Sequence, residues 1–154
     1  MAASELAAAE AVLKSIEGRW QTIYAEVDGE ALPDDRFSQT IGEFSDNRFK
    51  IEKAGVVAYE GTFYINVSSN PCGIVLIYSK SVNPMFLGGP RAGIVQIFED
   101  TKKTNFSEIG FPPPQDFNTF RNSGRALTVH RREGSTRVRE LLASGTNLGC
   151  GIMW

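Results

Sequence analysis

The sequence has few of the residues that most catalytic and metal sites need. It contains two cysteines and a single histidine among 154 residues, whereas a zinc site takes three or four ligands from His, Cys and carboxylates. We find no local motif of a Ser-His-Asp triad, and no glycine-rich loop that follows a strand and opens a helix. The sequence therefore predicts neither a metal centre nor a nucleotide-phosphate site.

The sequence also lacks a large excess of charge of one sign, and it lacks long apolar runs. The formal net charge is −2, from 16 basic and 18 acidic residues, which argues against a nucleic-acid partner because such proteins carry a basic surface. No stretch approaches the roughly 20 apolar residues of a membrane span, and the first residues lack a basic leader followed by an apolar core. We expect a soluble, cytoplasmic protein in which Cys72 and Cys150 are free thiols, with one disulfide bridge between them as the alternative.

Hydrophobic periodicity predicts a mostly β fold with a helix at each end of the chain. Apolar residues recur every three or four positions over 4–17, which is typical of an amphipathic helix, and a period of two begins at Arg19. Glycine in the middle of the long 57–67 segment predicts a bent strand. We expect helix 1–17, a barrel over 18–133 and a short helix and apolar tail over 134–154. The expected strands are 19–25, 40–44, 48–53, 57–67, 73–79, 94–99, 105–109 and 126–132.

Several segments, in their order and spacing, carry a resemblance to a known family. These are Ile16-Glu17-Gly18-Arg19-Trp20-Gln21, the turn Val27-Asp28-Gly29-Glu30-Ala31-Leu32-Pro33, the Glu60-Gly61-Thr62-Phe63 strand, the segment 93–98 and the closing 127–132. Over roughly residues 13–133 the chain resembles the lipocalin-like domains of uncharacterised planctomycete and other bacterial proteins. It departs from them at 113–117, where Pro-Pro-Gln-Asp-Phe replaces an Arg-Pro before the phenylalanine.

The resemblance implies a calycin-type antiparallel β-barrel of about eight strands. In the wider group of lipocalins and fatty-acid-binding proteins, a basic residue near the last strand lies over the indole of the first strand. By that analogy Trp20 and either Arg131 or Arg132 close one end of the barrel. A cation–π contact of this kind contributes about 1 kcal/mol, and its role is structural.

Alternation along the strands supplies candidate pocket residues. A barrel of eight strands is wide enough to hold one small ligand or to be packed solid. We expect a small hydrophobic molecule to bind residues that mix aromatic and hydrogen-bonding side chains: Tyr24, Phe49, Tyr59, Phe63, Gln96, Phe98 and Phe106. His130 shares a strand face with Ala126 and Thr128, so we expect it to point outward, and we expect neither haem nor another cofactor.

Two other functions fit the same sequence. A cyclase or isomerase could hold one reactive conformer in the barrel, since positioning alone can supply much of a rate enhancement. Glu108 is the carboxylate we single out for acid–base work in such an enzyme. Alternatively the protein is a subunit of a larger assembly that docks through its apolar tail, by Leu148, Ile152, Met153 and Trp154.

Overall fold

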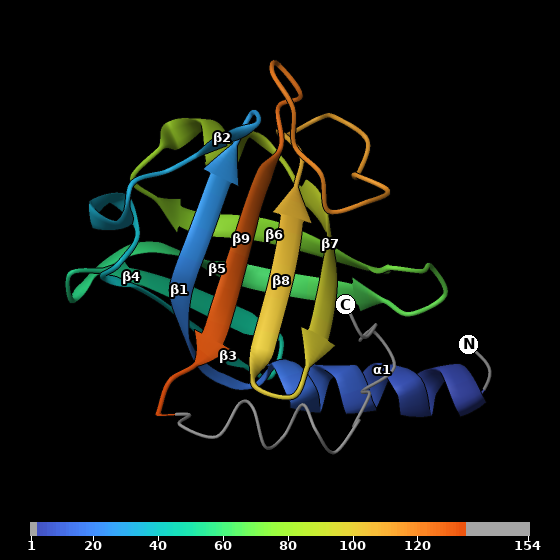
Figure 1. The fold of residues 1–154 in the computed structure, drawn as a ribbon. Coiled ribbons are helices and arrows are strands. Elements are labelled where there is room, and N and C mark those ends of the chain that lie inside the picture. The colour runs from blue at the N-terminus through green and yellow to red at the C-terminus, as the bar shows by residue number, and fades with distance from the viewer. Residues whose placement is uncertain (1–2, 135–154) are drawn as a thin grey trace.

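The fold is a closed antiparallel barrel of eight strands with one helix before it. The computed structural model describes residues 3–134. Helix α1 (Ala3–Ile16) precedes β1 (Gly18–Val27), and β9 (Ala126–Arg132) pairs with β1 to close the sheet (Figure 1). Between them lie β3 (Thr40–Ser45), β4 (Arg48–Lys53), β5 (Val56–Asn66), β6 (Cys72–Ser81), β7 (Arg91–Phe98) and β8 (Thr101–Phe106). The two-residue strand β2 (Glu30–Ala31) pairs only with β1 and is not one of the eight barrel strands. The predicted β class and barrel are confirmed.

Two irregularities in the pairing shape the barrel wall. On β5 the register with β6 shifts between Glu60 and Gly61, and a Cβ on Gly61 would overlap the carbonyl oxygen of Ile77. Only glycine allows the two strands to approach so closely at this bend. On β1 the pairing with β9 shifts between Thr22 and Tyr24. A bulge of this kind changes which side of the sheet the next residues face.

Helix α1 lies across one end of the barrel (Figure 1) and fills it with apolar side chains. Val12 and Ile16 are buried in the same cluster as Trp20, whose indole Nε1 donates a hydrogen bond to the Ile16 carbonyl oxygen at 2.8 Å. The Arg132 guanidinium stacks 4.2 Å from the Trp20 ring centroid and donates to the carbonyl oxygens of Ser15 and Glu17. A cation at a helix C-terminus is favourable there. We call this the helix-covered end.

The β7–β8 hairpin differs from the expectation. The sequence predicts strands over 94–99 and 105–109 and therefore a loop over the residues between them, including 100–103, but β8 begins at Thr101 and ends at Phe106. Glu99 adopts a φ of 56°, which permits a tight turn of Glu99 and Asp100 between the paired residues Phe98 and Thr101. The sequence hides this strand because its inward face is largely polar.

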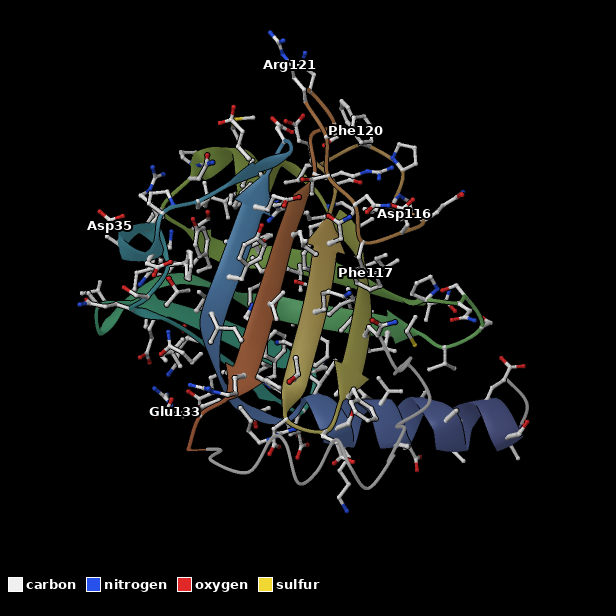
Figure 2. The ribbon with its side chains drawn as sticks, viewed as in Figure 1. Asp35, Asp116, Phe117, Phe120, Arg121 and Glu133 are labelled. Atoms are coloured by element: carbon white, nitrogen blue, oxygen red, sulfur yellow. The ribbon has the colours of Figure 1, made fainter. Side chains whose placement is uncertain are left out.

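The loop between β8 and β9 covers part of the outer barrel surface and reaches the other end. The Asn105 side chain, 0% exposed, donates to the carbonyl oxygens of Asp116 and Asn118 and fixes the loop on β8. Figure 2 shows Phe120 and Arg121 at the loop tip, above the end opposite α1. The 3-10 helices η1 (Asp34–Arg36) and η2 (Pro84–Gly88) lie at this same end, the mouth (Figure 1).

Three further expectations concern the chain as a whole. Within residues 3–134, α1 is too short to cross a lipid bilayer as a helix. Cys72 is 2% exposed and forms a disulfide, so the expectation of a free thiol at this position is wrong. The expected C-terminal helix and the apolar tail residues Leu148, Ile152, Met153 and Trp154 lie outside the described residues.

Candidate functional site

The interior of the barrel contains a cavity of about 230 Å³. That is the volume of roughly eight water molecules at about 30 Å³ each. The cavity extends from Lys102 near the helix-covered end to Arg91 at the mouth. Its lining residues are Thr22, Ala25, Leu32, Arg36, Phe37, Thr40, Gly42, Phe44, Ile51, Lys53, Tyr59, Ile74, Leu76, Tyr78, Arg91, Lys102, Thr104, Phe106, Ala126, Thr128 and His130.

One wall of the cavity, formed by β1, β9 and β8, is polar. Thr22 on β1 stands opposite His130 on β9, and His130 stands opposite Lys102 on β8, so the three side chains form one row across three strands. A second row holds Thr128 and Thr104, whose hydroxyl oxygens lie 2.6 Å apart in a hydrogen bond. The five residues Thr22, Lys102, Thr104, Thr128 and His130 are called the polar wall below.

The wall across the cavity is apolar and aromatic. It comes from β3 to β6, the strands that lie behind β1, β9 and β8 in Figure 1. Tyr78 packs edge-on against Phe49 and Tyr59, with ring centroids 5.3 and 5.9 Å apart, and Phe44 packs against Phe63 at 5.2 Å. Ring pairs at these distances are favourable and hold each other in place. The cavity is therefore amphipathic across its width.

Lys102 is the most unusual group in the polar wall. The residue is 2% exposed, and its Nζ lies 3.9 Å from the centroid of Phe44 and 5.0 Å from that of Trp20. Loss of hydration lowers the pKa of Lys102 well below its ordinary value, and the positive charge of Arg132 adds to the effect. No carboxylate within residues 3–134 forms an ion pair with this amine.

His130 lies beside Lys102 and is half-buried, with the Nδ1 atom of its ring fully buried. Its Nδ1 has no hydrogen-bond partner among the described residues. Burial lowers the pKa of His130 well below its ordinary value, the charge of Lys102 lowers it further, and a backbone interaction with Lys102 opposes both. The charge of Lys102 thus disfavours protonation of His130 when the cavity is empty.

Arg91 marks the mouth and is already well bound by the protein. Its Nε donates to the Ser107 carbonyl oxygen at 3.1 Å and its Nη1 donates to the Tyr78 hydroxyl at 3.3 Å. The guanidinium also stacks on Phe86 and Phe106, at 4.7 and 5.3 Å from the ring centroids. Burial raises the pKa of Tyr78, while Arg91 acts in the opposite direction. This cluster builds a rigid rim on one side of the mouth.

The structure brings only some of the predicted pocket residues into the cavity. Tyr59 and Phe106 line it, and Phe49 and Phe63 belong to the buried cluster that supports it. Gln96 and Phe98 are buried, but they alternate with the interior residues Val95 and Ile97 and so lie on the outer face of β7.

Three other expectations about individual residues are wrong. Tyr24 is 37% exposed and donates a hydrogen bond to Glu26, because the bulge in β1 turns it outward. Glu108 follows β8 as an exposed residue in a surface depression beside Gly124, outside the cavity. His130 points inward, because it lines the cavity together with Ala126 and Thr128, and Leu127, which alternates with them, is buried on the outer face of β9.

The closing pair of the barrel is Trp20 with Arg132. Arg131 is exposed and pairs in register with Gln21 and Thr101. Arg132, in contrast, makes the stacking contact with the indole and an ion pair with Asp100 at 3.1 Å. The arrangement joins α1, β1 and the β7–β8 turn, so its role at this end is structural.

Sequence reasoning missed Lys102, Thr104 and Thr128. A signal was present, because Phe106 was expected to face inward and alternation from it leads to Thr104 and then Lys102. The expected loop over 100–103 broke this alternation. Within the described residues no group of three or more His, Cys, Asp or Glu side chains is arranged to hold a metal ion.

The fold and cavity define a hollow eight-stranded antiparallel β-barrel that is closed at one end by a helix. Comparisons with protein-family models, with curated proteins and with solved structures find no match to this chain. The functional argument therefore depends on the geometry of the cavity.

Proposed function

We propose that this protein binds a small, mostly apolar molecule inside its barrel, as lipocalin-like proteins do. The observation that carries the proposal is the cavity of about 230 Å³ between an aromatic wall and a polar wall. Ligand sites are typically enclosed, mostly apolar and supplied with a few directed polar groups. The barrel fold is compatible with this use.

The size of the cavity limits the ligand. Pockets for drug-sized molecules span about 300–1,000 Å³, and the present cavity lies below that range. A single medium-length chain or one ring fits such a volume better than a large cofactor. The ligand would enter at the mouth, where Met85 and Leu87 of η2 and Phe120 of the loop are exposed apolar side chains.

An NMR titration with octanol tests the proposal. We expect saturable shift changes at Ile74, Leu76 and Thr104, which line the cavity. Gly42→Leu should abolish them, since Gly42 also lines the cavity and a Cβ there meets only Phe44 at 3.5 Å, leaving room for a side chain that fills the space. Gly88→Leu is the matched control, because nothing lies within 4 Å of a Cβ at Gly88.

If Gly42→Leu bound octanol with the same affinity as the parent protein, this outcome would count against the proposal. No observation favours a cyclase or isomerase over a binding protein, since Glu108, the carboxylate expected to do acid–base work, lies outside the cavity. Docking through the C-terminal tail stays a prediction.

A further inference from the structure

We propose that the ligand is an amphipathic monoanion whose acidic head group binds Lys102 and His130 at the helix-covered end of the cavity. The inference rests on the proposed ligand-binding function and assigns the chemical class of the ligand. Its apolar part would lie along the aromatic wall toward the mouth.

The charge of the cavity is the first argument. Its lining includes the basic residues Arg36, Lys53, Arg91 and Lys102 together with His130, and it includes no Asp or Glu. The chain as a whole has more acidic than basic residues, so the composition does not explain this excess. An interior with cations and no counter-charge attracts an anion.

Unsatisfied groups locate the head group at the helix-covered end. Lys102 Nζ contacts only ring faces among the interactions of the described residues, and the Nδ1 atom of His130 is buried without a partner. Buried polar atoms are normally paired, so the unpaired Nδ1 of His130 beside a buried lysine needs an explanation. A carboxylate has two oxygens with four lone-pair directions and can accept from both side chains at once.

The cations at the mouth are weaker candidates for the head group. Arg91 already donates to Ser107 and Tyr78 and stacks on two rings. Arg36 and Lys53 are exposed, so water and salt screen their attraction for an anion. The buried Lys102 is shielded from water and from salt.

Binding of an anion at this place should couple to uptake of a proton. The groups that face Lys102 are His130 and Arg132 on β9, and Asp100 at the β7–β8 turn is engaged with Arg132. The neighbours from β1, β3 and β7 are the uncharged Trp20, Phe44 and Ile97. Without a ligand these surroundings lower the pKa of Lys102; an anion would raise it again. Affinity for the anion should therefore fall as the pH rises.

Calorimetric titration with octanoate, octanol and octylamine tests the inference. We expect the parent protein at pH 7 to bind octanoate at least tenfold more tightly than octanol, and octylamine more weakly than either. Lys102→Met should remove the preference for octanoate over octanol. Lys103→Met is the control on the same strand, because Lys103 alternates with Lys102 and does not line the cavity, and it should keep the preference.

A pH series separates charge from shape. Between pH 6 and 9 octanoate stays ionised, so its affinity should decrease through titration of the protein, whereas octanol affinity should stay constant. Equal affinity of the parent protein for octanoate and octanol, or a preference that survives Lys102→Met, would overturn the inference while the binding function stands. Failure of both ligands to bind would refute the binding function itself, and the inference with it. The comparison of octanoate with octanol affinity on the parent protein does not depend on whether any variant folds.

Discussion

Replacing Lys102 by methionine should stabilise the empty barrel, because the amine occupies an interior position and has no hydrogen-bonding partner among residues 3–134. The ammonium contacts Phe44 and Trp20 at 3.9 and 5.0 Å, and a desolvated cation–π contact contributes about 2 kcal/mol. Loss of hydration costs several kcal/mol for an ion in a protein interior. Even the neutral amine costs roughly 1–3 kcal/mol when it is buried without a hydrogen bond. Methionine keeps the length of the side chain and removes both costs.

The pH dependence of the free energy of unfolding tests the same reasoning more sharply than a single stability value. The folded pKa of Lys102 is lowered, mainly by burial, from an unfolded value near 10.4. Between these two values the unfolded chain binds more protons than the folded one, so stability rises with pH. The slope reaches at most about 1.4 kcal/mol per pH unit for one proton. His130, whose pKa is also lowered, adds a rise of the same sign that is complete near pH 6.5.

Urea denaturation followed by circular dichroism at intervals from pH 6 to 9.5 measures these slopes. We expect the stability of Lys102→Met to exceed that of the parent protein at pH 7 by more than the roughly 1–3 kcal/mol of the neutral amine, and the difference to shrink toward that value at pH 9.5. Lys80→Met, at an exposed position of β6, should follow the parent curve. Parallel curves for Lys102→Met and the parent protein, or a less stable variant, would refute the reasoning.

Three further predictions concern the frame of the barrel. Gly61→Ala should lower stability by about 1–3 kcal/mol in thermal denaturation, because its Cβ overlaps a carbonyl oxygen of β6, whereas Gly88→Ala should change little; equal effects would contradict this account of the bend. Thr104→Val should cost about 1 kcal/mol by leaving the Thr128 hydroxyl unpaired, and adding Thr128→Val should recover most of it in a double-mutant cycle. Arg132→Gln should speed amide exchange in α1, whose last carbonyl groups it binds; unchanged exchange would exclude that role.

Much of the fold could be predicted from local patterns. The three- and four-residue spacing over 4–17 indicates α1, which the structure places at Ala3–Ile16. The alternation over 57–67 indicates β5, observed at Val56–Asn66. These patterns succeed because a helix or strand that borders a core must place apolar side chains at its own repeat. Turn residues such as Asp28 and Gly29, both with positive φ, then separate the elements.

The candidate site was harder to predict, because alternation separates two faces of a strand without saying which one is inside. On β9 the polar face lines the cavity, and Leu127 is buried on the outside. On β1 one extra residue at the bulge turns Tyr24 outward. Lys102 is a residue type that is almost never fully buried unless it is paired, so a sequence pattern assigns it to solvent.

The sequence by itself determined the helix and most of the strands, since each depends on neighbours within a few residues. Closure into one barrel was implied by the family resemblance, and it depends on the pairing of β1 with β9. Tertiary structure alone decided that the barrel is hollow, that one wall is polar, and that Lys102 and His130 meet inside it. These features arise from the register between strands that are distant along the chain. A shift of one residue in that register would exchange the inner and outer faces.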